Sequence, residues 1–98
     1  MTANGARGEV VAVLAGAERR LCLTLGALAE IETALEVDGL GALAERMRRL
    51  AAKDVVVVLA ALLRGGGETA LANDLPQAKV ELSDAAEAVA RAFAAVVR

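Results

Sequence analysis

The side chains that most often carry enzyme chemistry are scarce in this 98-residue chain. It has no histidine, tyrosine or tryptophan, and Ser83 and Cys22 are its single serine and its single cysteine. Nucleophilic catalysis needs a base beside the nucleophile, and no histidine is present to activate Cys22. The sequence therefore predicts a protein that is not an enzyme.

Three glutamates, Glu30, Glu32 and Glu36, are the remaining candidates for acid–base or metal chemistry. Glu32 and Glu36 are one helical turn apart, so their carboxylates could share a proton or a metal ion. A solvated helix edge explains the same spacing with fewer assumptions. The glycines at 65–67 lack the lysine and serine of a phosphate-binding loop. We expect no metal and no cofactor.

A basic patch is formed by Arg46, Arg48, Arg49 and Lys53. It could contact phosphates or an acidic partner. The net charge of −2 and the single aromatic residue argue against nucleic acid, which is usually held by positive charge and stacking rings. We therefore expect the patch to face solvent or an acidic protein surface.

The chain is 57% apolar, yet Phe93 is its only aromatic residue. Its core must be aliphatic, which gives little material for a ligand pocket. The longest apolar run, residues 55–63, is far shorter than the roughly 20 residues that span a bilayer. The N-terminus lacks the apolar stretch of a signal peptide. We expect a cytoplasmic protein with no membrane contact, in which Cys22 is a small buried apolar residue.

The positions of these side chains depend on where the apolar pattern changes, near Thr24, from the two-residue alternation of a strand to the three- and four-residue spacing of a helix. Residues 9–14 alternate as a strand, residues 15–18 suit a turn, and residues 19–24 suit the returning strand. A helix over 25–35 follows, with Thr24 as its N-cap. Its expected core face is Leu25, Leu28, Ile31 and Leu35.

Two further helices follow. Asp38 can cap the first of them, whose apolar face is Leu40, Leu43, Met47 and Leu50. Residues 55–63 begin with four valines that also suit a strand. A helix is favoured because Arg64 and the glycines at 65–67 form a C-terminal stop. Being apolar on all sides, this helix should be the buried centre of the fold.

A short helix over 68–74 and a last helix capped by Ser83 complete the pattern. The last helix carries an apolar stripe that can dock on the domain or on a partner: Leu82, Ala86, Val89, Phe93 and Val96. The predicted fold is α+β, with a β-hairpin over 8–24 packed on four to five helices over 25–98. We expect a single domain over 1–98, with residues 1–7 disordered.

Three segments together resemble the small tail proteins of gene transfer agents and related prophages. They are Arg7-Gly8-Glu9-Val10, then Leu21-Cys22-Leu23-Thr24-Leu25-Gly26-Ala27-Leu28-Ala29-Glu30-Ile31-Glu32, then Leu63-Arg64-Gly65-Gly66-Gly67. That family resembles phage tail assembly chaperones, and its members have also been described as tail tube proteins.

The resemblance implies a chaperone-like protein that binds tape-measure and tail tube proteins during tail assembly. Two alternatives stay open: a structural tube or tube-end subunit, and an unrelated small helical adaptor. The resemblance also implies association with phage-like particles, and self-association stays open. The candidate partner-binding residues are Arg46, Arg48, Arg49, Val89 and Phe93.

Overall fold

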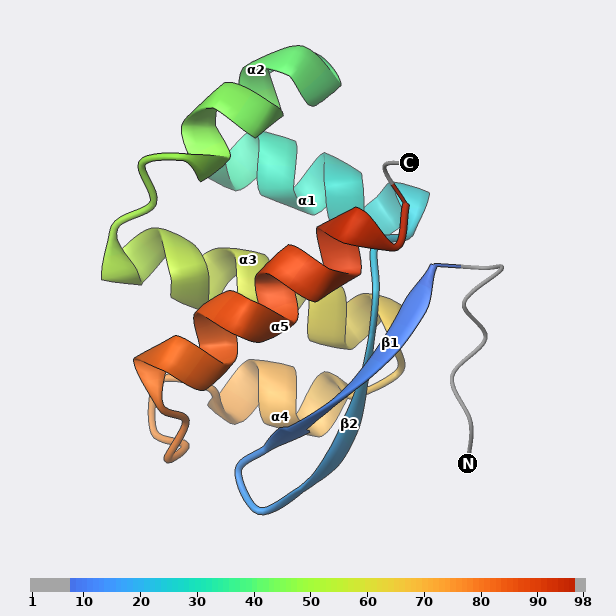
Figure 1. The fold of residues 1–98 in the computed structure, drawn as a ribbon, viewed down its shortest axis with the longest axis vertical. Coiled ribbons are helices and arrows are strands. Elements are labelled where there is room, and N and C mark those ends of the chain that lie inside the picture. Colours follow the sequence, from blue (N-terminus) through green and yellow to red (C-terminus); the bar gives the residue numbers. More distant parts are fainter. Residues whose placement is uncertain (1–7, 97–98) are drawn as a thin grey trace.

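Helix α3 (Ala52–Gly65) is the element around which most of the others pack in residues 8–96, the part that the computed structural model describes (Figure 1). It contacts β2 (Ala17–Cys22), α1 (Leu25–Leu35), α4 (Thr69–Asp74) and α5 (Leu82–Ala94). The remaining elements are β1 (Glu9–Leu14) and α2 (Gly39–Met47). The α+β prediction of a hairpin on a helical bundle is confirmed, and so is the helical prediction for residues 55–63. The expected disorder of residues 1–7 lies outside the described residues.

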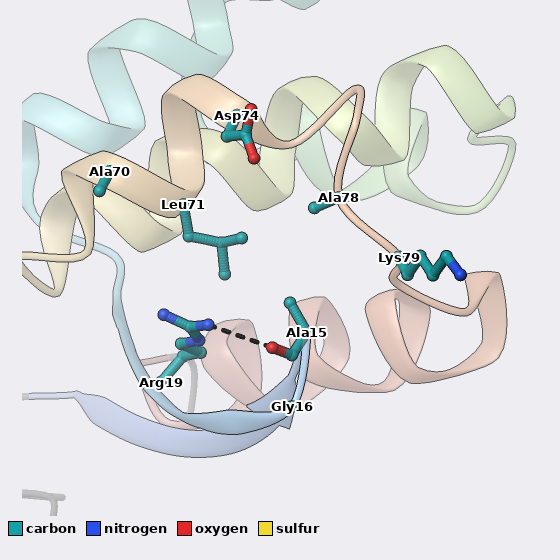
Figure 2. A pocket seen from close by; sticks show the side chains of 8 residues that line it. All are labelled: Ala15, Gly16, Arg19, Ala70, Leu71, Asp74, Ala78 and Lys79. Carbon is teal, nitrogen blue, oxygen red and sulfur yellow. Dashed lines mark hydrogen bonds between the residues drawn. The ribbon is translucent and has the colours of Figure 1, made fainter.

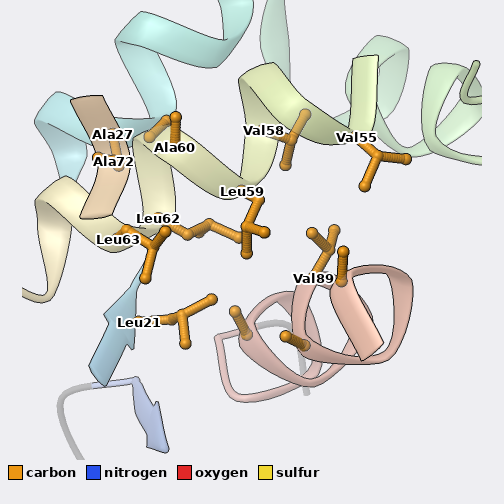
Figure 3. Close-up of a cluster of buried hydrophobic side chains, with 14 of the residues drawn as sticks. Leu21, Ala27, Val55, Val58, Leu59, Ala60, Leu62, Leu63, Ala72 and Val89 are labelled. Carbon is orange, nitrogen blue, oxygen red and sulfur yellow. The ribbon is translucent and has the colours of Figure 1, made fainter. Parts of the chain in front are cut away.

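Every element of the described chain contributes to one aliphatic core. Figure 3 shows Leu59, Leu62 and Leu63 of α3 pointing among side chains of the hairpin, α1, α4 and α5. Leu62 and Leu63 are fully buried, as expected for the central helix. Burial of an aliphatic side chain contributes about 1.5–3 kcal/mol, so these contacts hold the helices together.

The hairpin turn is tighter than predicted. Leu14 pairs with Ala17, which leaves a two-residue loop of Ala15 and Gly16, both with positive φ (52° and 81°). Such loops match the twist of the flanking strands. The turn expected over 15–18 begins at the right residue but ends two residues too late, and the returning strand expected over 19–24 was placed two residues too late. Residues 23 and 24 leave the sheet because β1 begins at the partner of Cys22.

The predicted N-cap of α1 is confirmed. The Thr24 hydroxyl accepts a hydrogen bond from the Ala27 N–H at 3.0 Å. The predicted core face was wrong at its first position, because Leu25 is 84% exposed. Leu25 is the first residue of the helix and lies before the turn that contacts the core. The face of α1 that is buried in the core consists of Ala27, Ile31 and Leu35.

Asp38 is the N-cap residue of α2, but its side chain makes no capping hydrogen bond. A carboxylate from the preceding helix replaces it, since Glu32 accepts from the Gly39 N–H at 2.7 Å. The expected apolar face was wrong at Leu40, which is 53% exposed, whereas Leu43 is buried. Only the second half of α2 therefore reaches the core.

The predicted cap of the last helix was also wrong. Helix α5 begins at Leu82 with Glu81 as its N-cap residue, so Ser83 lies inside the first turn. The expected apolar stripe is displaced as well, because Leu82 is 60% exposed and the helix buries a neighbouring face. That face is made of Ala85, Ala88, Val89 and Ala92.

The glycines after α3 do more than end the helix. A Cβ on Gly65 would lie 2.1 Å from the Cys22 carbonyl oxygen, and one on Gly66 would lie 2.1 Å from the Arg20 carbonyl oxygen. Helix and strand backbones therefore approach more closely than any other residue type would permit. The Glu68 carboxylate adds a hydrogen bond from the Arg20 N–H at 3.0 Å.

Candidate partner-binding groove

An apolar groove lies between the end of α2 and the side of α5. It encloses about 690 Å³, and Arg48 is the only charged residue among those that line it. Its larger apolar lining residues are Met47, Leu50, Val55, Leu82, Val89 and Phe93. Three smaller ones, Ala86, Ala90 and Ala94, follow one another at four-residue intervals along α5. The groove is therefore an open, mostly apolar surface, and the small alanine side chains of α5 make one side of it shallow.

The groove exists because α5 docks through its small side chains. Ala88 and Ala92 are buried against the rest of the fold, so the larger Leu82 and Phe93 are left at one side of the contact. Sequence periodicity alone pointed to the larger side chains as the docking face. The alanine face could have been found from the four-residue spacing of 85, 88, 89 and 92, which fits a helix equally well.

The structure brings together three of the five predicted partner-binding residues. Val89 forms part of the groove and is 2% exposed, while Phe93 is half-buried beside it. Arg48 lines the opposite wall, and its guanidinium lies 3.7 Å from the Glu45 carboxylate in an exposed pair. Exposed pairs of this kind are worth little energetically, so Arg48 can turn toward an incoming partner.

Arg46 has a structural role instead. Its guanidinium donates to the Asp54 carboxylate at 2.8 Å and to the Arg49 carbonyl at 3.3 Å. Asp54 is buried and also accepts from the Ala51 N–H at 3.0 Å. The hydrogen bond from Arg46, reinforced by that from Ala51, lowers the pKa of Asp54. These bonds hold the connection between α2 and α3, which carries the groove residue Leu50.

Arg49 is exposed and is not among the residues that line the groove. The predicted basic patch is thus divided: Arg48 lines the groove, Arg46 fixes the backbone beside it, and Arg49 and Lys53 stay at the surface. Sequence spacing could not separate these roles because Asp54, the partner of Arg46, lies in the next helix.

A second hollow lies between the hairpin turn and α4 (Figure 2). It contains the charged side chains Arg19, Asp74 and Lys79. The Arg19 guanidinium is committed to the turn, since it donates to the Leu14 carbonyl at 3.0 Å and to the Ala15 carbonyl at 3.3 Å. No side chain among those lining this hollow is a nucleophile with an adjacent base.

Two of the three glutamates considered above have ordinary structural partners, and the third, Glu36, is the exposed C-cap residue of α1. Glu30 pairs with Arg64 across α1 and α3, and Glu32 accepts from the Gly39 N–H. Within residues 8–96, no group of three or more histidine, cysteine, aspartate or glutamate side chains could hold a metal ion. Cys22 is buried, as predicted. In the same part of the chain, no helix combines the length and apolarity needed to cross a bilayer.

Comparison with known proteins identifies a family. A family model described as phage tail tube protein, GTA-gp10, matches residues 7–98. Neither the curated proteins nor the solved structures gave a match. The matched region includes the hairpin, all five described helices and both walls of the groove.

Proposed function

The chain belongs to the family described as phage tail tube protein, GTA-gp10, and from this premise we propose that it is a structural subunit of the tail of a gene transfer agent or a related phage-like particle. The observation that carries the proposal is the match over residues 7–98. It supports the tube-subunit alternative more than the chaperone role that the sequence resemblance placed first, and it gives no support to an unrelated adaptor.

The α2–α5 groove is the surface through which we propose that this subunit contacts a neighbouring tail protein. Its aliphatic lining suits an apolar helix face, which gains stability from burial without specific polar groups. Leu82 supports this role, because it is the large apolar groove residue that is most exposed, at 60%, and a partner that covered it would remove that apolar surface from water. The partners we propose are tube and tape-measure proteins. We also propose that copies of this chain associate with one another within the tail. The role requires no catalysis.

A chaperone role is the second candidate, and the open groove is the observation that favours it. A long helical tape-measure protein would offer apolar helix faces to such a surface. The two roles differ in where the protein ends up. A tube subunit remains in finished particles at high copy number, whereas a chaperone binds its client in the cytoplasm and leaves before the particle is complete.

The test combines purified particles with a pull-down from cells that produce them. Mass spectrometry of the particles should find this chain at a copy number comparable to other repeated tail proteins. Its absence from particles, together with recovery of a tape-measure protein in the pull-down, would establish the chaperone role instead. Absence from both samples would refute both roles.

Two matched substitutions test the groove itself. Leu82→Asp and Leu25→Asp each replace an exposed leucine at the first position of a helix, where a negative charge is favourable. Only Leu82 lines the groove. We expect Leu82→Asp to weaken capture of the tail partner about tenfold and Leu25→Asp to leave it unchanged, with both variants folded by circular dichroism. Equal capture by the two variants would place the contact elsewhere.

A further inference from the structure

The hairpin has one protected edge and one open edge. Because Leu14 and Ala17 flank a two-residue loop, they form a hydrogen-bonded pair, and the pairs then alternate along the ladder. Arg20 therefore directs its backbone groups outward from β2, and its N–H is bonded to Glu68. The close approach of Gly66 covers the same position. No further strand can be added beside β2.

On β1, the same alternation directs the backbone groups of Val11 and Val13 outward. Within the described chain, the N–H and C=O of these two residues have no hydrogen-bond partner outside the hairpin. Val13 is also 65% exposed. Natural edge strands usually carry a proline, a lysine or a bulge that prevents pairing, and β1 carries none of them.

We propose that β1 pairs with β1 of a second copy of this chain, antiparallel, about a two-fold axis at Ala12. This register places Val11 opposite the partner's Val13, and Val13 opposite the partner's Val11. Four backbone hydrogen bonds form, and two valine–valine cross-strand pairs cover the exposed side chains. The two hairpins become one four-stranded sheet.

The charges beside the open edge favour a second copy over an unrelated strand. Val11 lies opposite Arg20 and Val13 lies opposite Glu18 within each hairpin. In the paired sheet, each of the two valine rows therefore has Arg20 at one end and Glu18 at the other, whereas the central row has Arg19 at both ends. The two Arg19 side chains lie on the other face of the sheet, separated by both β1 strands, so the valine face of the strand is complementary to itself in shape and in charge.

The pairing stops at two copies because the β2 edge is covered. An isologous contact, in which the same surface patch of both copies meets, forms a closed dimer. A ring of subunits that all face the same way needs a heterologous contact between two different patches. The paired sheet therefore belongs to the free protein before assembly, and the inference holds whether the chain is a tube subunit or a chaperone.

The test uses two variants of the full chain, each with a substitution that should leave the hairpin of the monomer stable. Val11→Glu places a carboxylate opposite Arg20, and Val13→Lys places an ammonium opposite Glu18, so each forms a favourable pair within its own hairpin. Each variant alone loses both valine–valine pairs, and we expect its dimer dissociation constant to rise about tenfold. An equimolar mixture restores one valine–valine pair and adds one Glu–Lys pair across the interface.

Sedimentation over a concentration series should find a dimer for the wild-type chain, mostly monomer for each variant, and a heterodimer for the mixture. Slow amide hydrogen exchange at Val11 and Val13 in the dimer would place the contact on β1. A wild-type chain that stays monomeric up to about 1 mM, or that pairs only with a strand of another protein, would overturn the proposal. So would a dimer that neither variant weakens, or a mixture that does not recover.

Discussion

The close contact between the α3 terminus and β2 makes Gly66→Ala a decisive test of how the hairpin is held. Gly66 has φ −88° and ψ 0°, a conformation open to any residue, so the substitution imposes no backbone strain. Its cost is steric. The new Cβ would lie 2.1 Å from the Arg20 oxygen and 2.5 Å from the Arg20 carbonyl carbon.

Relief of this clash requires the strand to move away from the helix by about 1.3 Å, because the contact is 2.1 Å and ordinary contact begins near 3.4 Å. The strand cannot move independently, since Leu21 is fully buried and the Arg20 N–H is held by Glu68. Overpacking against fixed neighbours costs about 1–3 kcal/mol and occasionally more. We expect about 3 kcal/mol, which corresponds to a fall in Tm of about 15 °C for a domain of this size.

Gly41→Ala is the matched control. Gly41 lies inside α2, and a Cβ there would have no heavy atom within 4 Å. Alanine is favoured over glycine in a helix by up to about 1 kcal/mol, so this variant should be as stable as the wild type or slightly more stable. Urea unfolding followed by circular dichroism measures both. A Gly66→Ala protein as stable as Gly41→Ala would refute the steric argument.

Two further predictions concern the helix ends. Thr24→Ala should destabilise the protein by about 1 kcal/mol, because the Ala27 N–H loses its acceptor; Thr24→Ser should retain most of the stability, and equal loss in both variants would show that the hydroxyl does not matter. The pKa of Asp54 is lowered below its ordinary value of 3.8 by the hydrogen bond from Arg46 and then by that from Ala51. The ionised form therefore stabilises the fold above about pH 4, and this contribution is lost as the pH falls through the lowered pKa. Asp54→Asn should have a lower Tm than wild type at pH 7, and the difference should shrink below about pH 4. A difference that does not change with pH would mean that the charge of Asp54 contributes nothing.

The elements of this protein could largely be predicted from its sequence, because they depend on local chemistry. The Thr24 cap, the end of α1 and the glycine stop after α3 each involve residues within a few positions of one another. The central place of α3 also followed from composition, since a helix that is apolar on every side has to be buried. The family resemblance rested on the same contiguous segments, and the family match confirmed it.

The candidate site depended on contacts that no local pattern contains. Two faces of α5 had helical spacing, and the choice between them was made by the short alanine side chains that let the helix lie close to its neighbours. That choice left Leu82 and Phe93 in the groove. Arg46 was drawn away from the basic patch by an aspartate in the next helix, and Glu32 replaced Asp38 as the cap of α2. Local sequence thus set which helices form, whereas side-chain volume and reach across the tertiary structure decided which of their faces remain open to a partner.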